Sequence, residues 1–342
     1  MNGSRSARPK LADVAKLAGV SLGSASRALN DPKSVKPKTL AAVRAAADQL
    51  AYVPDGSARS LALRRSNTIG AVVPTIDNPV YAEFVHALQR RLSRAGYSLI
   101  CSAHDYDPGE EVLLVERLMQ RGIDGLVLIG TDHDEALVAK IARASIPCLF
   151  VWSTDEQVRG TTIGFSNRRA MHQLTRHLVD LGHRRFAVLS GDVARNERAR
   201  GRLAGIVDIL DLAGLALPQE NILFGSFAIE AGRAGLRAAL ALEPRPTALM
   251  CATDLLAAGA MAEAKALGIK VPEQLSITGF DDIPYAPLMN PPLTTVHVPT
   301  IELGEQAGDA MLKAVLGETP RSQQLLTTLV VRGSTGPAPA PE

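Results

Sequence analysis

From residue 67 onward the chain alternates short apolar runs with longer stretches of helical spacing, and this alternation restricts the possible folds most. The first series has the runs TIGAVVP, YSLICSA, GLVLIG and PCLFVW, with helices expected around 81–95, 109–121 and 134–143. The second series has RFAVLSG, ENILFGS, TALMCA and LSITGF, with helices expected around 168–181, 200–213, 229–242 and 254–267. Strands that alternate with helices form parallel sheets through right-handed crossovers. The two series therefore predict two doubly wound α/β lobes.

A two-lobed body of this kind predicts a small-molecule site. Ligands of open α/β sheets bind at the carboxyl ends of the strands, at a switch point or between lobes, and such lobes close by hinge motion. Thr253 and Asp281 each follow an apolar run directly, so both are expected at this edge. An aspartate there can accept hydrogen bonds from two sugar hydroxyls, although a turn or capping role for Asp281 is the alternative.

The first 66 residues differ in charge from the rest. They contain twelve Lys/Arg and four Asp/Glu, a net charge of +8, whereas the remainder has 25 Lys/Arg and 31 Asp/Glu, a net charge of −6. A small basic segment joined to an acidic body is typical of a polyanion-binding head. On charge alone, a solvated basic arm is equally compatible.

The spacing of apolar residues gives this head an architecture. The positions i, i+3, i+4 and i+7 of a short amphipathic helix are filled by Leu11, Val14, Ala15 and Ala18. Gly19 ends that helix, and Ser21 is suited to cap a second helix at about 22–29. A third helix is expected at about 37–51. Two helices joined by a four-residue turn and supported by a third predict a helix-turn-helix.

The segment LADVAKLAGVSLGSASRALN closely resembles the opening of the LacI/GalR (lactose repressor) family of transcription regulators. The resemblance covers nearly all of residues 10–335, and its further carriers include IDNPVYAEF, LGHRRFAVLSG, ATDLLAAGAM, ITGFDDIPYA and VVRGST. It implies a helix-turn-helix head (1–54), a hinge helix and linker (55–66) and a two-lobed periplasmic-binding-protein-like effector and dimerisation domain (67–335). The Pro-rich end of the sequence is expected to be a disordered tail (336–342).

The resemblance also implies which residues contact DNA. They are Ser21, Leu22, Gly23, Ser24, Ser26, Arg27, Asn30 and Leu61. The Arg27 guanidinium can pair bidentately with O6 and N7 of guanine, whereas the serines and the asparagine match phosphate-contacting positions. Leu61 matches the hinge leucine that wedges between base pairs and kinks the DNA. The structural alternatives are an ordinary solvated arginine, plain helix surface for the serines and a linker residue for Leu61.

The effector-binding residues implied by the same resemblance and by the composition of the pocket are Asn78, Tyr81, Trp152, Asn196, Arg198, Arg202, Phe227, Thr253 and Asp281. For Arg202, a structural salt bridge is the alternative. Trp152, Ser166 and Val298 depart from the residues common in the family, which leaves the ligand open. Aromatic residues with several arginines suit a sugar acid or a sugar phosphate as well as a neutral sugar.

Other classes of protein lack support in the sequence. The motifs of P-loop, α/β-hydrolase and zinc enzymes are missing, and no metal or cofactor is expected. Three dispersed cysteines in apolar runs indicate reduced thiols of a cytoplasmic protein. A periplasmic-type solute-binding protein without a regulatory role is the alternative, but it should carry an export signal and lack the basic head. Together with the family resemblance, the sequence therefore predicts a cytoplasmic, homodimeric regulator, expected to be a repressor, that binds a pseudo-palindromic operator.

Overall fold

The structure is a computed structural model that describes residues 9–53, 65–154 and 160–340. The chain divides into two compact units, residues 1–66 and 67–342. The predicted hinge at 55–63, including Leu61, lies outside the described residues. The predicted tail is revised in part, because the Ala338 N–H donates to the carbonyl of Leu181 at 2.9 Å and so joins this segment to the body.

The first unit is the expected three-helix head. Its elements are α1 (Leu11–Leu17), α2 (Leu22–Asn30), the 3-10 turn η1 (Pro32–Ser34) and α3 (Pro37–Gln49). Its small core is built from the buried residues Val14, Ala15, Ala25, Ala28, Val43, Ala46 and Ala47. Ser21 caps α2, since its side chain accepts a hydrogen bond from the Ser24 N–H at 3.2 Å. The short α2 is therefore fixed at its start by a cap and along one face by alanine packing.

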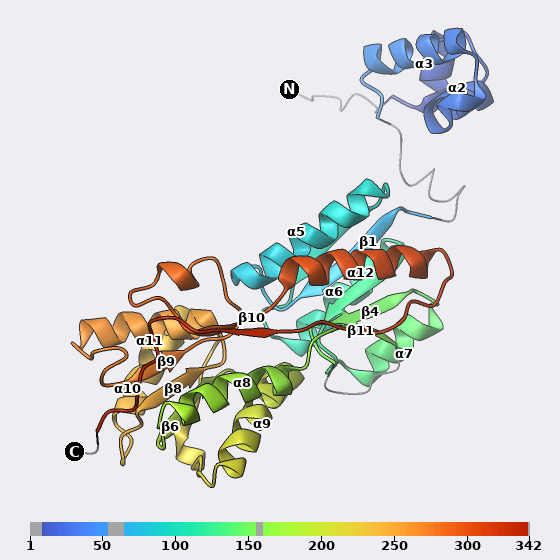
Figure 1. Ribbon diagram of the computed structural model, residues 1–342. Coiled ribbons are helices and arrows are strands. Elements are labelled where there is room, and N and C mark those ends of the chain that lie inside the picture. The colour runs from blue at the N-terminus through green and yellow to red at the C-terminus, as the bar shows by residue number, and fades with distance from the viewer. Residues whose placement is uncertain (1–8, 54–64, 155–159, 341–342) are drawn as a thin grey trace, which may run out of the picture. The chain divides into compact units, whose positions relative to one another are not determined.

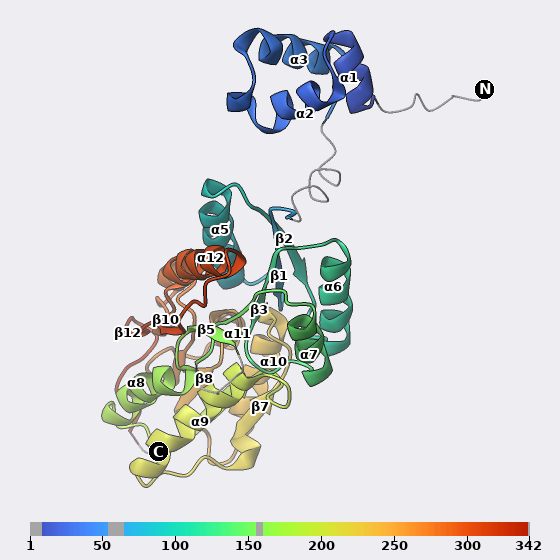
Figure 2. The ribbon, with the colours of Figure 1, turned by 90° about the vertical axis from the view of Figure 1, so that its right-hand side faces the viewer.

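The second unit begins with a lobe built on a six-stranded parallel sheet in the order β11-β5-β4-β3-β1-β2 (Figure 1). The strands are β1 (Thr68–Val73), β2 (Ser98–Ala103), β3 (Gly125–Ile129), β4 (Cys148–Val151), β5 (Thr161–Gly164) and β11 (Gln323–Gln324). The helices are α5 (Pro79–Arg94), α6 (Pro108–Gln120), α7 (Glu135–Arg143) and α12 (Thr300–Val315). Figure 2 shows α5 and α12 on one face of this sheet and α6 and α7 on the other.

The second lobe has a four-stranded parallel sheet in the order β7-β6-β8-β9. Its strands are β6 (Phe186–Ser190), β7 (Ile222–Phe224), β8 (Ala248–Cys251) and β9 (Ser276–Thr278), beside the antiparallel pair β10 (Thr295–His297) and β12 (Thr328–Val330). Its helices are α8 (Asn167–Asp180), α9 (Glu197–Leu212), α10 (Ile229–Leu240) and α11 (Asp254–Ala266), with the 3-10 turns η2 (Gln219–Asn221) and η3 (Ala286–Leu288).

The two lobes are not two consecutive halves of the chain. After β10 in the second lobe, the chain returns to the first lobe as α12 and β11, and then crosses back into β12. The predicted series of strands and helices are present, but α12, β5 and the short strands β10–β12 were not predicted. Three segments consequently connect the lobes, near residues 165–167, 298–300 and 324–328. Among the described residues, no helix is long and apolar enough to span a bilayer.

Candidate functional site

The exposed face of α2 carries the residues predicted to read bases. Leu22 is 54% exposed although it is a large apolar side chain, and Gly23 and Arg27 are exposed beside it. Ala25 and Ala28 are buried on the opposite face. Of the predicted phosphate contacts, Ser21, Ser24, Ser26 and Asn30 are at least partly accessible on the same helix, and the Asn30 side chain donates to Ser26 Oγ at 3.3 Å. An arginine and a leucine presented this way match the chemistry of a major-groove surface.

Eight of the nine predicted effector residues line one small cavity between the lobes. From the first lobe come Asn78, Tyr81 and Tyr106, and from the second come Asn196, Arg198, Ala199, Arg202, Phe227, Thr253 and Asp281. Three of these residues cap helices that start where strands end: Asn78 caps α5, Asn196 caps α9 and Thr253 caps α11. The helix starts and the carboxyl ends of the strands thus converge on the cleft, as the α/β topology requires.

Asp281 is the buried carboxylate of this cleft. It lies at the end of the second-lobe sheet with φ of 119° and accepts a hydrogen bond from Asn78 Nδ2, on the other lobe, at 3.4 Å. Burial raises the pKa of Asp281 to about 7, although the nearby Arg202 acts to lower it. The carboxylate is therefore available as a hydrogen-bond acceptor whose charge depends on pH near neutrality.

Arg202 is held rigidly in the same cleft. Its Nε donates to Asn167 Oδ1 at 3.0 Å, and its Nη1 donates to the carbonyl of Ala252 at 2.6 Å. The guanidinium also stacks on the Phe280 ring at 3.7 Å from the centroid. These partners are an amide, a carbonyl and a ring, so the arrangement positions the guanidinium at the cleft without relying on the salt bridge considered from sequence.

Trp152 is the exception among the predicted effector residues. It is fully buried, and its ring packs behind Tyr81 at 4.8 Å and against Phe84 at 5.3 Å between centroids. The prediction for Trp152 is therefore revised: it supports Tyr81 from behind and does not line the cavity. Its φ of 83° turns the chain at the end of β4, which explains why sequence position alone did not show its direction.

The sequence analysis missed Tyr106 and Ala199, which line this cavity, and Glu197 beside it. Tyr106 lies in the loop after β2, and its ring packs on Phe227 from the other lobe with 4.8 Å between centroids. Glu197, the first residue of α9, is buried beside Arg198, with 3.2 Å between its Oε1 and Arg198 Nη1. The position of Tyr106 just beyond the carboxyl end of an apolar run was a usable signal. Glu197 gave none, because the Thr131 N–H that binds its carboxylate belongs to the other lobe and lies far away in the sequence.

The residues that depart from the family pattern have structural roles. Ser166 caps α8 by accepting a hydrogen bond from the Arg169 N–H at 3.1 Å, and Val298 is buried in the core. Asp254, also buried, accepts hydrogen bonds from the Ile283 N–H and Thr295 Oγ1, and burial raises its pKa to about 6. Within the described residues, no cluster of His, Cys, Asp and Glu is arranged to hold a metal ion.

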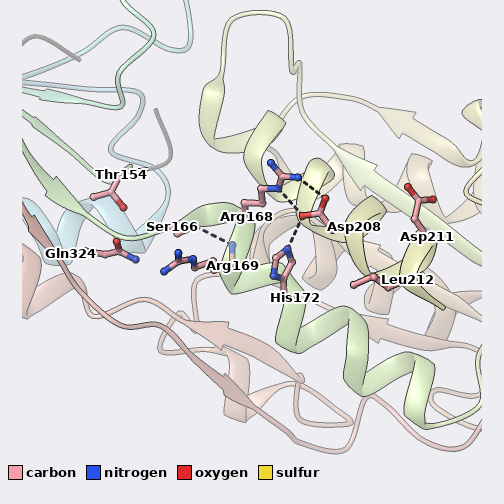
Figure 3. A pocket seen from close by; sticks show the side chains of 9 residues that line it. All are labelled: Thr154, Ser166, Arg168, Arg169, His172, Asp208, Asp211, Leu212 and Gln324. Atoms are coloured by element: carbon pink, nitrogen blue, oxygen red, sulfur yellow. Dashed lines mark hydrogen bonds and ion pairs between the residues drawn. The ribbon is translucent and has the colours of Figure 1, made fainter. Parts of the chain in front are cut away.

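A larger hollow of the second unit lies outside the cleft. It has a volume of about 780 Å³ and is lined by Thr154, Ser166, Arg168, Arg169, His172, Asp208, Asp211, Leu212 and Gln324. Figure 3 shows that Arg168 and His172 of α8 both point to Asp208 of α9, with bonds of 2.6 and 2.7 Å. It is an open groove in which Arg168 and His172 pair with Asp208. The interlobe cleft, with its buried charges and aromatic rings, is the better ligand site despite its smaller volume.

Comparison with known proteins decides the family. The model of "Bacterial regulatory proteins, lacI family" matches residues 10–55, and that of "Periplasmic binding protein-like domain" matches residues 175–335. The chain is 32% identical over 312 residues to the HTH-type transcriptional repressor PurR of Haemophilus influenzae, covering 91% of this chain and 93% of that protein. It is 33% identical over 325 residues to the ribose operon repressor of Escherichia coli, covering 94% and 98%. The chain belongs to the LacI family.

Solved structures of LacI-family proteins have the same architecture. The Lac repressor dimer bound to operator and the anti-inducer ONPF matches with a TM-score of 0.84 and 29% identity, over 96% of this chain and 100% of that chain. The CelR–cellobiose complex matches with a TM-score of 0.70 and 30% identity, over 96% and 100%. This LacI-family chain is therefore a DNA-binding transcriptional repressor with an effector-binding domain, and not an enzyme. The head matched at 10–55 rules out the alternative of a solute-binding protein without a regulatory role.

Proposed function

We propose that this repressor binds a pseudo-palindromic operator as a cytoplasmic homodimer, and that a sugar, sugar acid or sugar phosphate in the interlobe cleft controls its operator affinity. The observation that carries the effector half is the convergence of Asn78, Arg202 and Asp281, from both lobes, on one buried cavity. A ligand bound to groups on both lobes favours one arrangement of the lobes over another, which is what effector control requires.

The chemistry of the cleft supports a polar ligand with an apolar face. Asp281 accepts hydrogen bonds, Arg202 donates them, and the rings of Tyr106 and Phe227 cover a flat apolar surface, which together suit a sugar ring. Among the relatives, one is named for the ribose operon, and one is solved in complex with cellobiose. Together with the donor Arg202 and the acceptor Asp281, these names support a saccharide as the ligand of this chain in preference to a purine.

The DNA half of the proposal rests on α2. Arg27 and Leu22 would contact base edges, and Ser21, Ser24, Ser26 and Asn30 would contact phosphates, with Gly23 allowing close approach. Two copies are needed because the two half-sites of a pseudo-palindrome mirror a two-fold axis. Sedimentation of the purified protein should give the mass of two chains, and a mass of one or four chains would contradict the homodimer.

A thermal-stability screen tests the effector half. Sugars, sugar acids and sugar phosphates are added to the full-length protein, and a ligand at 100 times its Kd should stabilise the folded state by about 2.7 kcal/mol. The variant Asp281→Ala should lose the response, whereas the matched variant Asp208→Ala, which alters the open groove of Figure 3, should keep it. If a compound stabilises both variants equally, the cleft is not its site.

A further inference from the structure

The first turn of α9 is bonded across the cleft to the end of β3. Glu197 Oε1 accepts a hydrogen bond from the backbone N–H of Thr131 at 2.9 Å, and Arg198 Nη1 donates to the carbonyl of Ile129 at 3.2 Å. Glu197 and Arg198 belong to the second lobe, whereas residues 129–131 belong to the first. The two side chains thus join the lobes through main-chain atoms, which cannot move away without moving the strand.

Gly130 shows how closely these parts fit. It has φ of 93°, a conformation that favours glycine, and a Cβ at this position would overlap Arg198 Nη1 and stand 2.7 Å from Glu197 Oε1. Any other residue here would be strained and would push the two side chains away. The close approach of α9 to β3 therefore depends on the absence of a side chain at residue 130.

The pair is buried as well as bonded. Glu197 is 2% exposed and Arg198 is 7% exposed. Burial acts to lower the pKa of Arg198, but the Glu197 carboxylate and the neighbouring Tyr81 and Tyr106 outweigh it and hold the pKa above its usual value. When the lobes separate, Glu197 and Arg198 still pair with each other, but Glu197 loses the Thr131 N–H and Arg198 loses the Ile129 carbonyl until water replaces them.

The free space in the cleft is divided into two cavities, and Arg198 lines both of them. The inner cavity, beside Asp281 and Arg202, has a free volume of only about 10 Å³, room for about one water molecule. An outer cavity of about 210 Å³ is lined by His104, Glu111, His133, Glu197 and other residues. Tyr106, Asn196, Arg198 and Phe227 line both cavities. Ligand pockets typically have about 300–1,000 Å³, so a sugar can reach Asp281 only if the two spaces join. Arg198 is one of the four residues between them, and its guanidinium is the group bonded across the cleft.

We propose that Glu197 and Arg198 form a latch that holds the two lobes together across the cleft, and that an effector reaches Asp281 by displacing the Arg198 guanidinium. The statement about the effector rests on the proposed function, whereas the statement about closure does not. The fraction of molecules with an open latch sets the apparent affinity, because a ligand that needs a minor state binds more weakly by that fraction. Arg198 is thus a positioning residue that sets the effector threshold.

Hydrogen exchange of the Thr131 amide tests the latch without any ligand or DNA. In the full chain, Arg198→Met removes the guanidinium but leaves both atoms of the Glu197–Thr131 bond in place. Faster exchange at Thr131 therefore reports separation of the lobes and not the deletion of its acceptor. We expect at least a tenfold increase in exchange rate and a larger radius of gyration by small-angle scattering. The same is expected for Gly130→Ala, whose Cβ drives Arg198 out.

Two matched controls separate the latch from general damage. Arg168→Met removes an arginine–carboxylate pair contained within the second lobe, and Gly122→Ala places a Cβ at a similar positive φ of 72° with no atom within 4 Å. Both should leave Thr131 exchange and the radius of gyration unchanged. Unchanged Thr131 exchange in a folded Arg198→Met protein would overturn the latch. An open latch in a protein that responds to no sugar would contradict the proposed effector class and leave the latch standing.

Discussion

Two carboxylates of the second lobe respond to their surroundings in opposite ways. Asp281 is enclosed in the cleft, and burial raises its pKa to about 7. Asp208 lies in the open groove, where hydrogen bonds from Arg168 and His172 lower its pKa. Both have an arginine nearby, so burial, and not the presence of a cation, decides the sign of the shift.

The raised pKa of Asp281 predicts a pH-dependent stability. Its contribution to stability is fully present below the unfolded-state pKa and is lost as pH rises through about 7. Asp281→Asn lacks this loss, so wild type should lose about 1.4 kcal/mol per pH unit relative to the variant between pH 5 and 7. Urea unfolding of both proteins at several pH values measures this difference. Parallel pH profiles would contradict it, and Asp208→Asn should show its difference from wild type disappearing toward acidic pH instead.

Arg27 gives a prediction at the DNA-reading surface. Arg27→Ala should cost about 1–3 kcal/mol per half-site and relax preference at one base pair, because a bidentate guanine contact is lost. Selection of binding sites from a random DNA pool, followed by affinity measurement, checks it. Arg44→Ala, an exposed arginine on α3, is the matched control and should not change sequence preference. A variant Arg27→Ala that selects the wild-type sequence would show that Arg27 does not read a base.

At the scale of elements, α12 shows why close packing is hard to foresee. Its sequence contains Gly304 and Gly308, which lower helix propensity and obscure the pattern. Both glycines lie against α5: a Cβ on Gly304 would stand 2.6 Å from the carbonyl oxygen of Phe84, and one on Gly308 would stand 2.7 Å from Arg91 Cγ. The two helix backbones approach each other because these positions have no side chain.

Gly304→Ala should therefore destabilise the second unit. Alanine gains about 0.5–1 kcal/mol of helix propensity, but overpacking against the α5 backbone costs about 1–3 kcal/mol, so the net effect is a loss. Denaturant unfolding followed by circular dichroism measures it. Gly23→Ala in α2, where no atom lies within 4 Å, is the control and should be neutral or stabilising. A gain in stability from Gly304→Ala would mean that α12 does not lie against α5.

The sequence predicted the elements that obey a strong period and missed those that depend on distant partners. The strands β1–β4 and β6–β9 can be recognised in the sequence as apolar runs. In contrast, β11 consists of two glutamines and forms only because it pairs with β5. Likewise, Thr253 and Asp281 were found because residues at the carboxyl ends of strands share an edge, whereas Asn78 was implied by the family resemblance. The latch was not found, because residues 129–131 and 197–198 are brought together only by the relation of two lobes.

For the whole molecule, the +8 charge of residues 1–66 predicts strong salt dependence. Binding of this head to DNA releases condensed counterions, so log affinity should fall linearly with log salt, with a slope of about −0.9 per phosphate neutralised. Fluorescence anisotropy with labelled DNA at 50–200 mM salt measures the slope. The remainder of the chain has a net negative charge, so it does not contribute to this release of counterions from DNA. A slope near zero would mean that the basic head does not lie on phosphates.

The three segments that connect the lobes have a mechanical consequence. The first and third lie side by side, since the Leu325 N–H donates to the carbonyl of Gly164 at 2.7 Å. Two lobes joined by three segments can rotate about these segments as a hinge but cannot translate apart. A single angle between the lobes therefore describes how far the cleft is open. DNA binding that responds to the angle between the lobes does not depend on the identity of the ligand that sets this angle. Chemically unrelated compounds that set the same angle would be equivalent signals, and new effectors can be acquired by changing the cleft lining alone.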